Sequence, residues 1–239
     1  MCSSDLFNDA IDAARDRAHP KKRHRPIAAG RITSSFAFLM ASVLAVTALV
    51  GGALAVSWQF AVVGALYVAN NIVYSTWLKD KAIADVMSIA AGFVLRLVAG
   101  AVAIAVTPSA WLIVCGFNVS LLLGFGKRRT EVGLEHAHSY RQSLSIYTAE
   151  KLDVLMAVSA TLSIVTYMMY TLAPSTVRIH GTEQLIYTVP FVMYGVFRFV
   201  FKSHEGKGSG PVEILTSDWV FVLNGVLWVA AVLVILGLR

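Results

Sequence analysis

Charged side chains are scarce in this chain: 14% of its 239 residues are Asp, Glu, Lys or Arg, whereas 57% are hydrophobic. Soluble domains carry about 25% charged residues, so the composition argues against a soluble protein. The chain also has only two cysteines, Cys2 and Cys115, too few and too far apart for a disulfide framework or a metal cage. Cys115 lies in an apolar run and is expected to be a small buried hydrophobe.

Long apolar stretches take up most of the remaining sequence. A helix needs about 20 residues to cross a bilayer, and seven stretches reach this length alone or with their flanking residues. The expected fold class is an all-α polytopic bundle of transmembrane helices, forming a single integral-membrane domain. The predicted spans are Ser34–Val56, Trp58–Trp77, Asp85–Val106, Ser109–Phe125, Asp153–Leu172, Leu185–Phe201 and Trp219–Leu238.

Lysine and arginine are nearly absent from one side of this topology. Because the spans alternate in direction, the connecting segments fall into two sets, and one set contains only Arg178 and Arg239. The positive-inside rule therefore places the other set in the cytoplasm. That cytoplasmic set consists of residues 1–33, 78–84, 126–152 and 202–218.

The first cytoplasmic segment gathers three carboxylates. Asp9, Asp12 and Asp16 are spaced three and four residues apart, so they share one face of a helix, with Asn8 at its edge. Three carboxylates so close together repel one another unless a cation neutralises them. A set of oxygen ligands without His or Cys suits Mg²⁺, which proteins usually hold with a few carboxylates together with substrate phosphates.

A basic cluster follows the carboxylates directly. Pro20 and Pro26 interrupt the helix, and the cations around them suit phosphate oxygens. A solvated helix end followed by a topology-setting basic loop is the alternative interpretation. Carboxylates beside cations favour metal-bridged phosphate or diphosphate binding at the cytoplasmic membrane face. The candidate phosphate ligands are Lys21, Lys22, Arg23 and Arg25.

The motif N-D-x-x-D-x-x-x-D, formed by Asn8, Asp9, Asp12 and Asp16, resembles the first aspartate-rich motif of the UbiA superfamily of intramembrane prenyltransferases. Its continuation DRAHPKKRHRPIAAG resembles the decaprenyl-phosphate phosphoribosyltransferase branch. The resemblance begins near Leu6 and covers nearly the whole chain. It is strongest over residues 8–31, 70–101, 124–151 and 194–218.

Tyr74 and Lys79 resemble the Y-S-x-x-L-K element of this family, which implies contact with a substrate phosphate. Taken singly, they would be an interfacial aromatic and a positive-inside anchor. Arg96 is different, because it lies eleven residues after Asp85, about 16 Å along a helix. A charge this deep marks a functional pathway by default, although a structural ion pair is the alternative. Asp85, Ile89, Gly92 and Arg96 are expected to share one helix face.

The cytoplasmic segment 126–152 repeats the arrangement of acids beside cations. The resemblance makes this segment the second half of the active site. Classical members have a second aspartate-rich motif there, whereas this chain has Glu131 and Glu135, which fits the phosphoribosyltransferase branch. Segment 198–219, with Glu213 and Asp218, is a candidate lid. Further candidate substrate ligands in segment 126–152 are Lys127, Arg128, Glu131 and Arg141, with Tyr147 a weaker one.

The resemblance implies a donor, 5-phosphoribosyl diphosphate, and an acceptor, a polyprenyl (decaprenyl) phosphate. Asp9, Asp12 and Asp16 would hold Mg²⁺ on the donor diphosphate, and the basic cluster would bind the donor phosphates. Lys79 and Arg96 would position the lipid phosphate, whose anionic oxygen attacks C1 of ribose without a general base. The residues expected to be catalytic are Asp12, Asp16, Lys79 and Arg96.

The implied product is a polyprenylphosphoryl 5-phosphoribose, used toward cell-wall arabinan. The expected location is the plasma membrane, with the active site facing the cytoplasm. No nucleic-acid partner is expected, and a homo-oligomeric state stays open. The alternatives are an aromatic prenyltransferase, which would need the second aspartate-rich motif, and a transporter or channel, for which no internal repeat is seen.

Family members begin with a membrane span and most of a second one before the N-D motif. Only seven residues precede Asn8 in this chain, and seven residues cannot cross a bilayer. The expectation is therefore a UbiA-type bundle with seven full spans and the cytoplasmic end of an eighth, against nine in the family, and with the first helix and most of the second missing.

Overall fold

The structure is a computed structural model that describes residues 3–18, 22–132, 142–205 and 211–237. The described residues form helices and connecting turns, with no β-strand among them. The chain divides into two compact units, which are described separately below. The first unit comprises Met1–Thr107 with Ser139–Ser143, and the second comprises Pro108–His138 with Leu144–Arg239.

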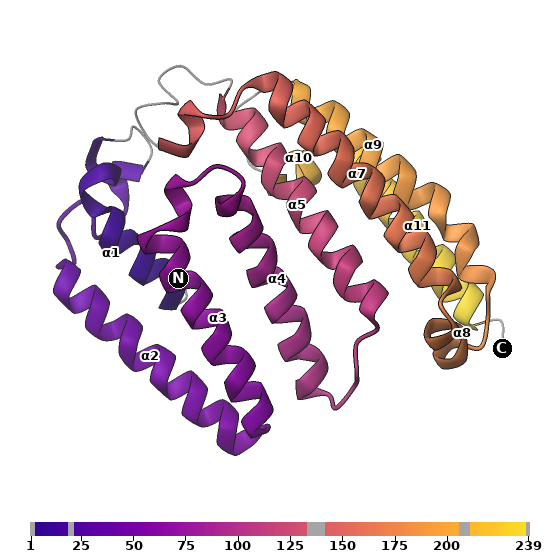
Figure 1. Ribbon diagram of the computed structural model, residues 1–239, viewed down its shortest axis with the longest axis horizontal. Helices are drawn as coiled ribbons and strands as arrows, with labels where there is room; N and C mark the ends of the chain where they lie inside the picture. Colours follow the sequence, from indigo (N-terminus) through magenta and orange to yellow (C-terminus); the bar gives the residue numbers. More distant parts are fainter. Residues whose placement is uncertain (1–2, 19–21, 133–141, 206–210, 238–239) are drawn as a thin grey trace. The chain divides into compact units, whose positions relative to one another are not determined.

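The helices of the first unit pack against their sequence neighbours. Helix α3 lies against both α2 and α4, and the short helix α1 lies against α2 and α3 (Figure 1). The elements in chain order are α1 (Ser3–Ala18), the 3₁₀ turn η1 (Lys22–His24), α2 (Ser34–Ala55), α3 (Trp58–Thr76), the 3₁₀ turn η2 (Leu78–Asp80) and α4 (Ala84–Ala103).

Helix α1 is amphipathic, and its apolar face fixes its position. Ala10 and Ala13 are buried with Ile27 and Ala37 in a small core, and Leu6 packs against this core. Phe7 meets Phe38 edge to face, with ring centroids 5.4 Å apart, an arrangement that aromatic pairs favour. The apolar face of α1 therefore lies on α2, which leaves the aspartates on another face.

Hydroxyl side chains mark where several spans begin. Thr33 Oγ1 accepts a hydrogen bond from the Phe36 N–H at 3.3 Å, and Ser57 Oγ accepts one from the Phe60 N–H at 3.2 Å. Such N-caps bind backbone donors that the first helical turn leaves free. Helices α2 and α3 accordingly start at the residues predicted from the sequence.

The second unit is built around α7. Helix α7 packs against α5 and α9, and α9 packs in turn against α11 (Figure 1). Helices α8 and α10 are short. Helix α8 lies against α7, and α10 lies against α5, α9 and α11. The elements are α5 (Ala110–Val132), the 3₁₀ turn η3 (Gln142–Ser145, which begins in the first unit), α7 (Ala149–Leu172), α8 (Pro174–His180), η4 (Gln184–Thr188), α9 (Val189–His204), α10 (Pro211–Ser217) and α11 (Trp219–Gly237).

The predicted all-α membrane fold is confirmed, but the count of seven spans is not. In the described part of the chain, six helical segments are long and apolar enough to cross a membrane: α2, α4, α5, α7, Gln184–His204 and α11. Helix α3 forms where it was predicted but is less apolar, because it contains Gln59, Asn70 and Asn71.

Two helices extend beyond their predicted spans. Helix α5 continues from Phe125 to Val132, and α7 begins at Ala149 instead of Asp153. Both extensions carry charged residues, which are compatible with helix but not with the bilayer interior. An apolar run in the sequence therefore locates the membrane-spanning segment but underestimates the length of the helix.

Segment 198–219 was expected to form a loop that could act as a lid. Most of its described part is helical instead. Helix α9 continues through Arg198 to His204, α10 follows, and residues 206–210 lie outside the described ranges. Asp218 then caps α11, because its Oδ1 accepts hydrogen bonds from the Val220 and Phe221 N–H groups at 3.0 and 3.3 Å. A lid function stays a prediction.

Asp218 also forms a two-pronged pair with Arg198, at 2.8 and 2.9 Å. This guanidinium, together with the capped N–H groups, holds the pKa of the Asp218 carboxyl below its usual value. The unfolded pKa is about 3.9, so Asp218 stabilises the fold fully above about pH 4. This stabilisation is lost as the pH falls through the lower pKa of the folded state.

We expect Asp218→Ala to destabilise the chain by at least about 1 kcal/mol at pH 7, because it removes the cap and the ion pair. Asp218→Asn keeps a capping side chain and should have intermediate stability. Thermal unfolding in detergent tests this order, with the exposed Glu213→Ala as the control. The difference in unfolding temperature between the unsubstituted chain and Asp218→Ala should become smaller near pH 3. Equal stability of the Asn and Ala variants at pH 7 would contradict a capping role.

Candidate active site

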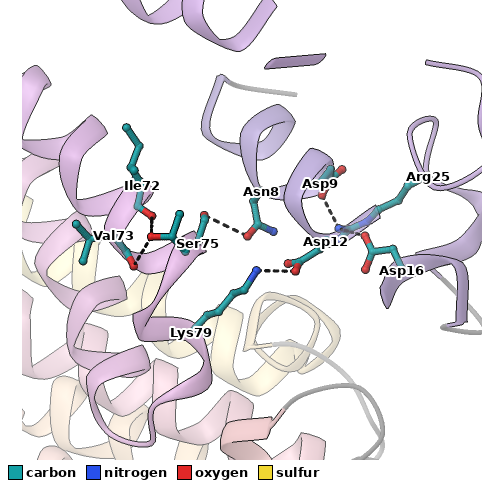
Figure 2. A network of polar contacts seen from close by, with 10 residues as sticks. Asn8, Asp9, Asp12, Asp16, Arg25, Ile72, Val73, Ser75 and Lys79 are labelled. Atoms are coloured by element: carbon teal, nitrogen blue, oxygen red, sulfur yellow. Dashed lines mark hydrogen bonds and ion pairs between the residues drawn. The ribbon is translucent and has the colours of Figure 1, made fainter. Parts of the chain in front are cut away.

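The three aspartates of α1 divide into a pair and a single residue. Asp9 and Asp16 are seven residues apart, close to two full turns, so they point the same way. Asp12 is three residues from Asp9 and is therefore rotated by about 60° from it. Figure 2 shows Asp9 and Asp16 on one side of the helix and Asp12 turned toward Lys79. The predicted helical face is confirmed, and its two parts have different partners.

Arg25 bridges the aspartate pair. Its Nη1 atom lies 2.6 Å from Asp9 Oδ1 and 3.0 Å from Asp16 Oδ2 (Figure 2). Both carboxylates are buried, whereas the Arg25 side chain is 39% exposed. The guanidinium thus neutralises two buried acids while one edge stays open to a ligand.

A compact turn after α1 places Arg25 beside the aspartates. The Ala29 N–H donates to the Arg25 carbonyl at 2.8 Å, and Arg17 Nε donates to the Ala28 carbonyl at 3.2 Å. Gly30 has a φ of +74°, a backbone conformation that favours glycine. The turn folds the basic segment back along α1, so a cation nine residues after Asp16 can reach it.

Lys79 contacts the third aspartate from a different part of the chain. Its Nζ lies 2.6 Å from Asp12 Oδ1, and the lysine is buried. Near this contact, Ser75 Oγ donates to Asn8 Oδ1 at 3.3 Å (Figure 2). These bonds join α1 to the C-terminal end of α3 and to η2, in each case across 67 residues of sequence. The resemblance placed Lys79 at a substrate phosphate, and the structure places it at an aspartate of the same site.

A polar pocket of about 220 Å³ adjoins the aspartates within the first unit. Asn8 and Ser75 line one part of it, and Tyr67 and Arg96 line another. Asn70 and Ser88 bridge α3 and α4 beside the pocket, because each donates to an oxygen of the other at 3.0 Å. Its remaining lining residues are Asn71, Tyr74, Ile89, Gly92 and Phe93.

Arg96 lines this pocket, and its expected role in binding an anion stays a prediction. Its guanidinium donates to the Tyr67 hydroxyl, and its Cζ atom lies 4.9 Å from the Tyr67 ring centroid and 5.3 Å from that of Phe93. Cation–π contacts of this kind hold a guanidinium without neutralising it. Ile89, Gly92 and Arg96 line the pocket together, as their shared helix face predicted, whereas Asp85 is fully buried.

Two arginines of segment 126–152 pair with acids of the second unit. Buried Arg128 lies 2.5 Å from Glu131, and Arg129 lies 2.7 Å from Asp153, which also lies 3.0 Å from His204 Nε2. Lys127 is exposed and Tyr147 is buried. Their expected role as the second half of the active site stays a prediction.

Among the described residues of the basic cluster, Arg23 contacts a neighbouring histidine and not an aspartate. Arg23 is exposed, with its Nε 3.4 Å from His24 Nε2. Lys22 begins η1, while Lys21, Glu135 and Arg141 lie outside the described residues.

Sequence reasoning also missed a set of polar pocket residues. Asn70 and Asn71 could have been predicted, because two adjacent amides interrupt an otherwise apolar run. The contact between Tyr67 and Arg96 could not, because the two residues are 29 positions apart in the sequence. Ser88 and Phe93 in the pocket were also missed, as was Asp153, which pairs with Arg129 in the second unit.

The ligand chemistry fits a hard divalent cation shared with a substrate. No group of three or more His, Cys, Asp or Glu residues converges into a metal cage within the described ranges. Mg²⁺ is usually held by one or two carboxylates and by substrate phosphates, without such a cage. Asp9 and Asp16 supply two carboxylate oxygens close to a single nitrogen atom, and Asp12 lies one turn away. This donor set suits Mg²⁺ bound together with a diphosphate.

Comparisons with known proteins agree with this chemistry. The model of the UbiA prenyltransferase family matches residues 1–213. The decaprenyl-phosphate phosphoribosyltransferase of Mycolicibacterium smegmatis is 32% identical over 95% of this chain and 74% of its own length. The Mycobacterium tuberculosis protein of the same name is 31% identical over the same shares. A UbiA homologue from Archaeoglobus fulgidus, solved bound to DMAPP and Mg²⁺, superposes with a TM-score of 0.76 at 16% identity. It covers 99% of this chain and 83% of its own, which shows a shared fold.

We expect Arg25→Gln to reduce the free energy of unfolding by about 1–2 kcal/mol, because it removes the cation between two buried carboxylates. The unfolding temperature of the chain should fall accordingly. Adding Asp9→Asn should recover part of the loss, since it removes one of the two repelling charges. Thermal unfolding in detergent measures both variants, with the exposed Arg178→Gln as the control. A double variant less stable than Arg25→Gln alone would contradict a charge-neutralising role for Arg25.

Proposed function

The chain belongs to the UbiA prenyltransferase family, and we propose that it transfers a 5-phosphoribosyl group from 5-phosphoribosyl diphosphate to a polyprenyl phosphate. The similarity to decaprenyl-phosphate phosphoribosyltransferases over 95% of the chain supports this reaction over the other chemistry of the family. The observation on which the proposal rests is the pairing of Asp9, Asp12 and Asp16 with Arg25 and Lys79 beside the polar pocket.

The aspartates and their cations have complementary tasks in this reaction. Asp9, Asp12 and Asp16 would hold Mg²⁺, which neutralises charge on the donor diphosphate and on the diphosphate that leaves. Arg25 has an exposed edge that can donate hydrogen bonds to the same phosphates. Lys79 keeps Asp12 in place and adds positive charge on the side of α3. The site thereby stabilises the negative charge of a departing diphosphate.

The substitution at ribose requires no acid or base from the chain. An oxygen of the lipid phosphate forms a bond to C1, and the bond between C1 and the diphosphate oxygen breaks with its electron pair on the diphosphate. The attacking oxygen is already anionic, so no proton has to be removed. The chain contributes orientation and charge stabilisation.

The helices of this integral membrane protein explain how two such different substrates meet. The polyprenyl tail stays in the lipid, and its phosphate lies at the membrane surface, where the water-soluble donor arrives. The distribution of lysine and arginine favours the cytoplasmic face of the plasma membrane for this surface. The product, a polyprenylphosphoryl 5-phosphoribose, would then serve cell-wall arabinan synthesis.

We expect the purified chain, in lipid vesicles with Mg²⁺, to transfer label from 5-phosphoribosyl diphosphate to decaprenyl phosphate. Asp12→Asn should reduce the rate at least about tenfold, because it weakens a metal ligand and breaks the pair with Lys79. Glu183→Gln, an exposed acid outside the site, is the matched control and should keep full activity.

Two outcomes would contradict the proposal. Full Mg²⁺-dependent turnover by Asp12→Asn would exclude Asp12 as a metal ligand. Transfer of a prenyl group from a prenyl diphosphate to an aromatic acceptor, without any phosphoribosyl transfer, would favour the aromatic prenyltransferase alternative.

A further inference from the structure

The pocket beside the aspartates has chemically distinct ends. At one end, Asn8 and Ser75 adjoin the aspartate site, and at the other end lie Tyr67 and Arg96. Along α3, Ser75 at the aspartate end and Tyr67 at the other end are eight residues apart, about 12 Å at 1.5 Å rise per residue. The pocket therefore forms a path that extends from Asn8, which adjoins the aspartates in sequence, to Arg96.

Arg96 is prepared for an anion at its end of the path. The Tyr67 hydroxyl and the rings of Tyr67 and Phe93 fix the guanidinium from two sides without cancelling its charge. Arg96 is exposed and lines the pocket. An ordered, charged guanidinium with free donors is a suitable receptor for a phosphate group.

Neutral hydrogen-bonding groups line the middle of the path. Asn70 and Ser88 bind each other, and Asn71 Nδ2 donates to the Tyr67 carbonyl at 2.8 Å, which orients the amide. Buried Gly92 lines the pocket, and a side chain there would take up space beside Asn70 and Tyr67, since its Cβ would lie 3.4 Å from Asn70 Nδ2 and 3.7 Å from the Tyr67 ring. Oriented amides and hydroxyls beside an open backbone suit the hydroxyl groups of a sugar.

The spacing between the two ends decides which phosphate Arg96 can bind. The attacking lipid oxygen must come within about 3–3.5 Å of C1, and C1 is bonded to the diphosphate at the aspartates. Arg96 binds Tyr67, about 12 Å along α3 from Ser75 at the aspartate end, and is too distant to orient that oxygen. The 5-phosphate, in contrast, is attached at the opposite end of the sugar from C1. It can follow the path toward Arg96.

We propose that Arg96 binds the 5-phosphate of the donor, and that Tyr67 is the positioning residue that holds the Arg96 guanidinium toward it. This inference rests on the proposed function, and it replaces the expectation that Arg96 positions the lipid phosphate. The length of the pocket would then select a phosphorylated pentose. The diphosphate would bind at Asp9, Asp12 and Asp16, and the sugar would lie between α3 and α4.

Direct binding to the purified chain in lipid nanodiscs tests this assignment without requiring turnover. The probes are ribose 5-phosphate, ribose, inorganic diphosphate with Mg²⁺, and farnesyl phosphate as a short polyprenyl phosphate. Ribose 5-phosphate should bind more tightly than ribose. Arg96→Gln should weaken ribose 5-phosphate roughly 10- to 100-fold, the loss expected for hydrogen bonds to a charged group. It should leave diphosphate and farnesyl phosphate binding unchanged, as should the control Arg178→Gln.

Variants around Arg96 separate positioning from general damage. Tyr67→Phe keeps the ring contact and loses the hydroxyl, so it should weaken ribose 5-phosphate less than Tyr67→Ala does. Arg96→Lys keeps the charge and should recover part of the affinity lost in Arg96→Gln. Gly92→Val should block ribose 5-phosphate and spare inorganic diphosphate. In the transfer assay, Tyr67→Phe should raise KM for the donor with little change in kcat or in KM for the lipid.

The inference is overturned if the unsubstituted chain binds ribose 5-phosphate no better than ribose. It is also overturned if Arg96→Gln weakens farnesyl phosphate and not ribose 5-phosphate, which would return Arg96 to the lipid phosphate. Failure of the proposed function gives a different result: no labelled lipid forms from the unsubstituted chain, whatever the binding of ribose 5-phosphate.

Discussion

Mutual repulsion of three carboxylates on one short helix is the constraint on which the site depends. Asp9, Asp12 and Asp16 lie within two turns of α1, and two of them are buried. Helix propensity cannot hold such charges together, so the chain brings cations to them. Arg25 reaches them through a turn that folds back on α1, and Lys79 reaches them from η2, which follows α3. The contacts that hold α1 in place are therefore the same contacts that neutralise the charge of its aspartates.

In the proposed reaction, the same cations serve phosphate binding. A diphosphate with Mg²⁺ would bring both signs of charge to the aspartates, and Arg25 and Lys79 lie beside these aspartates. The partly exposed edge of Arg25 and the deep guanidinium of Arg96 lie at different places along the same unit. A donor with phosphates at both ends of a sugar matches this separation of cations better than a prenyl diphosphate with an apolar tail.

The sequence predicted the parts of the structure that depend on local patterns. The apolar runs located the spans, and the three-and-four spacing of the aspartates predicted their common helix face. Helix extensions beyond the bilayer were missed because charged residues such as Arg128 and Glu150 continue a helix without lengthening the apolar run. The contacts of Lys79 with Asp12 and of Arg96 with Tyr67 join residues 67 and 29 positions apart. Tertiary packing decides such contacts, and no local pattern encodes them.

The most direct test of this account exchanges the charges of one pair. Asp12→Lys and Lys79→Glu should each lower the unfolding temperature, because each places like charges together at the contact between α1 and α3. The double exchange should restore much of the stability but not the Mg²⁺-dependent phosphoribosyl transfer, since the carboxylate then projects from η2 and not from α1. A double variant as unstable as the single ones would contradict the structural role of the pair. A fully active double variant would contradict the role of Asp12 in holding the metal and the diphosphate.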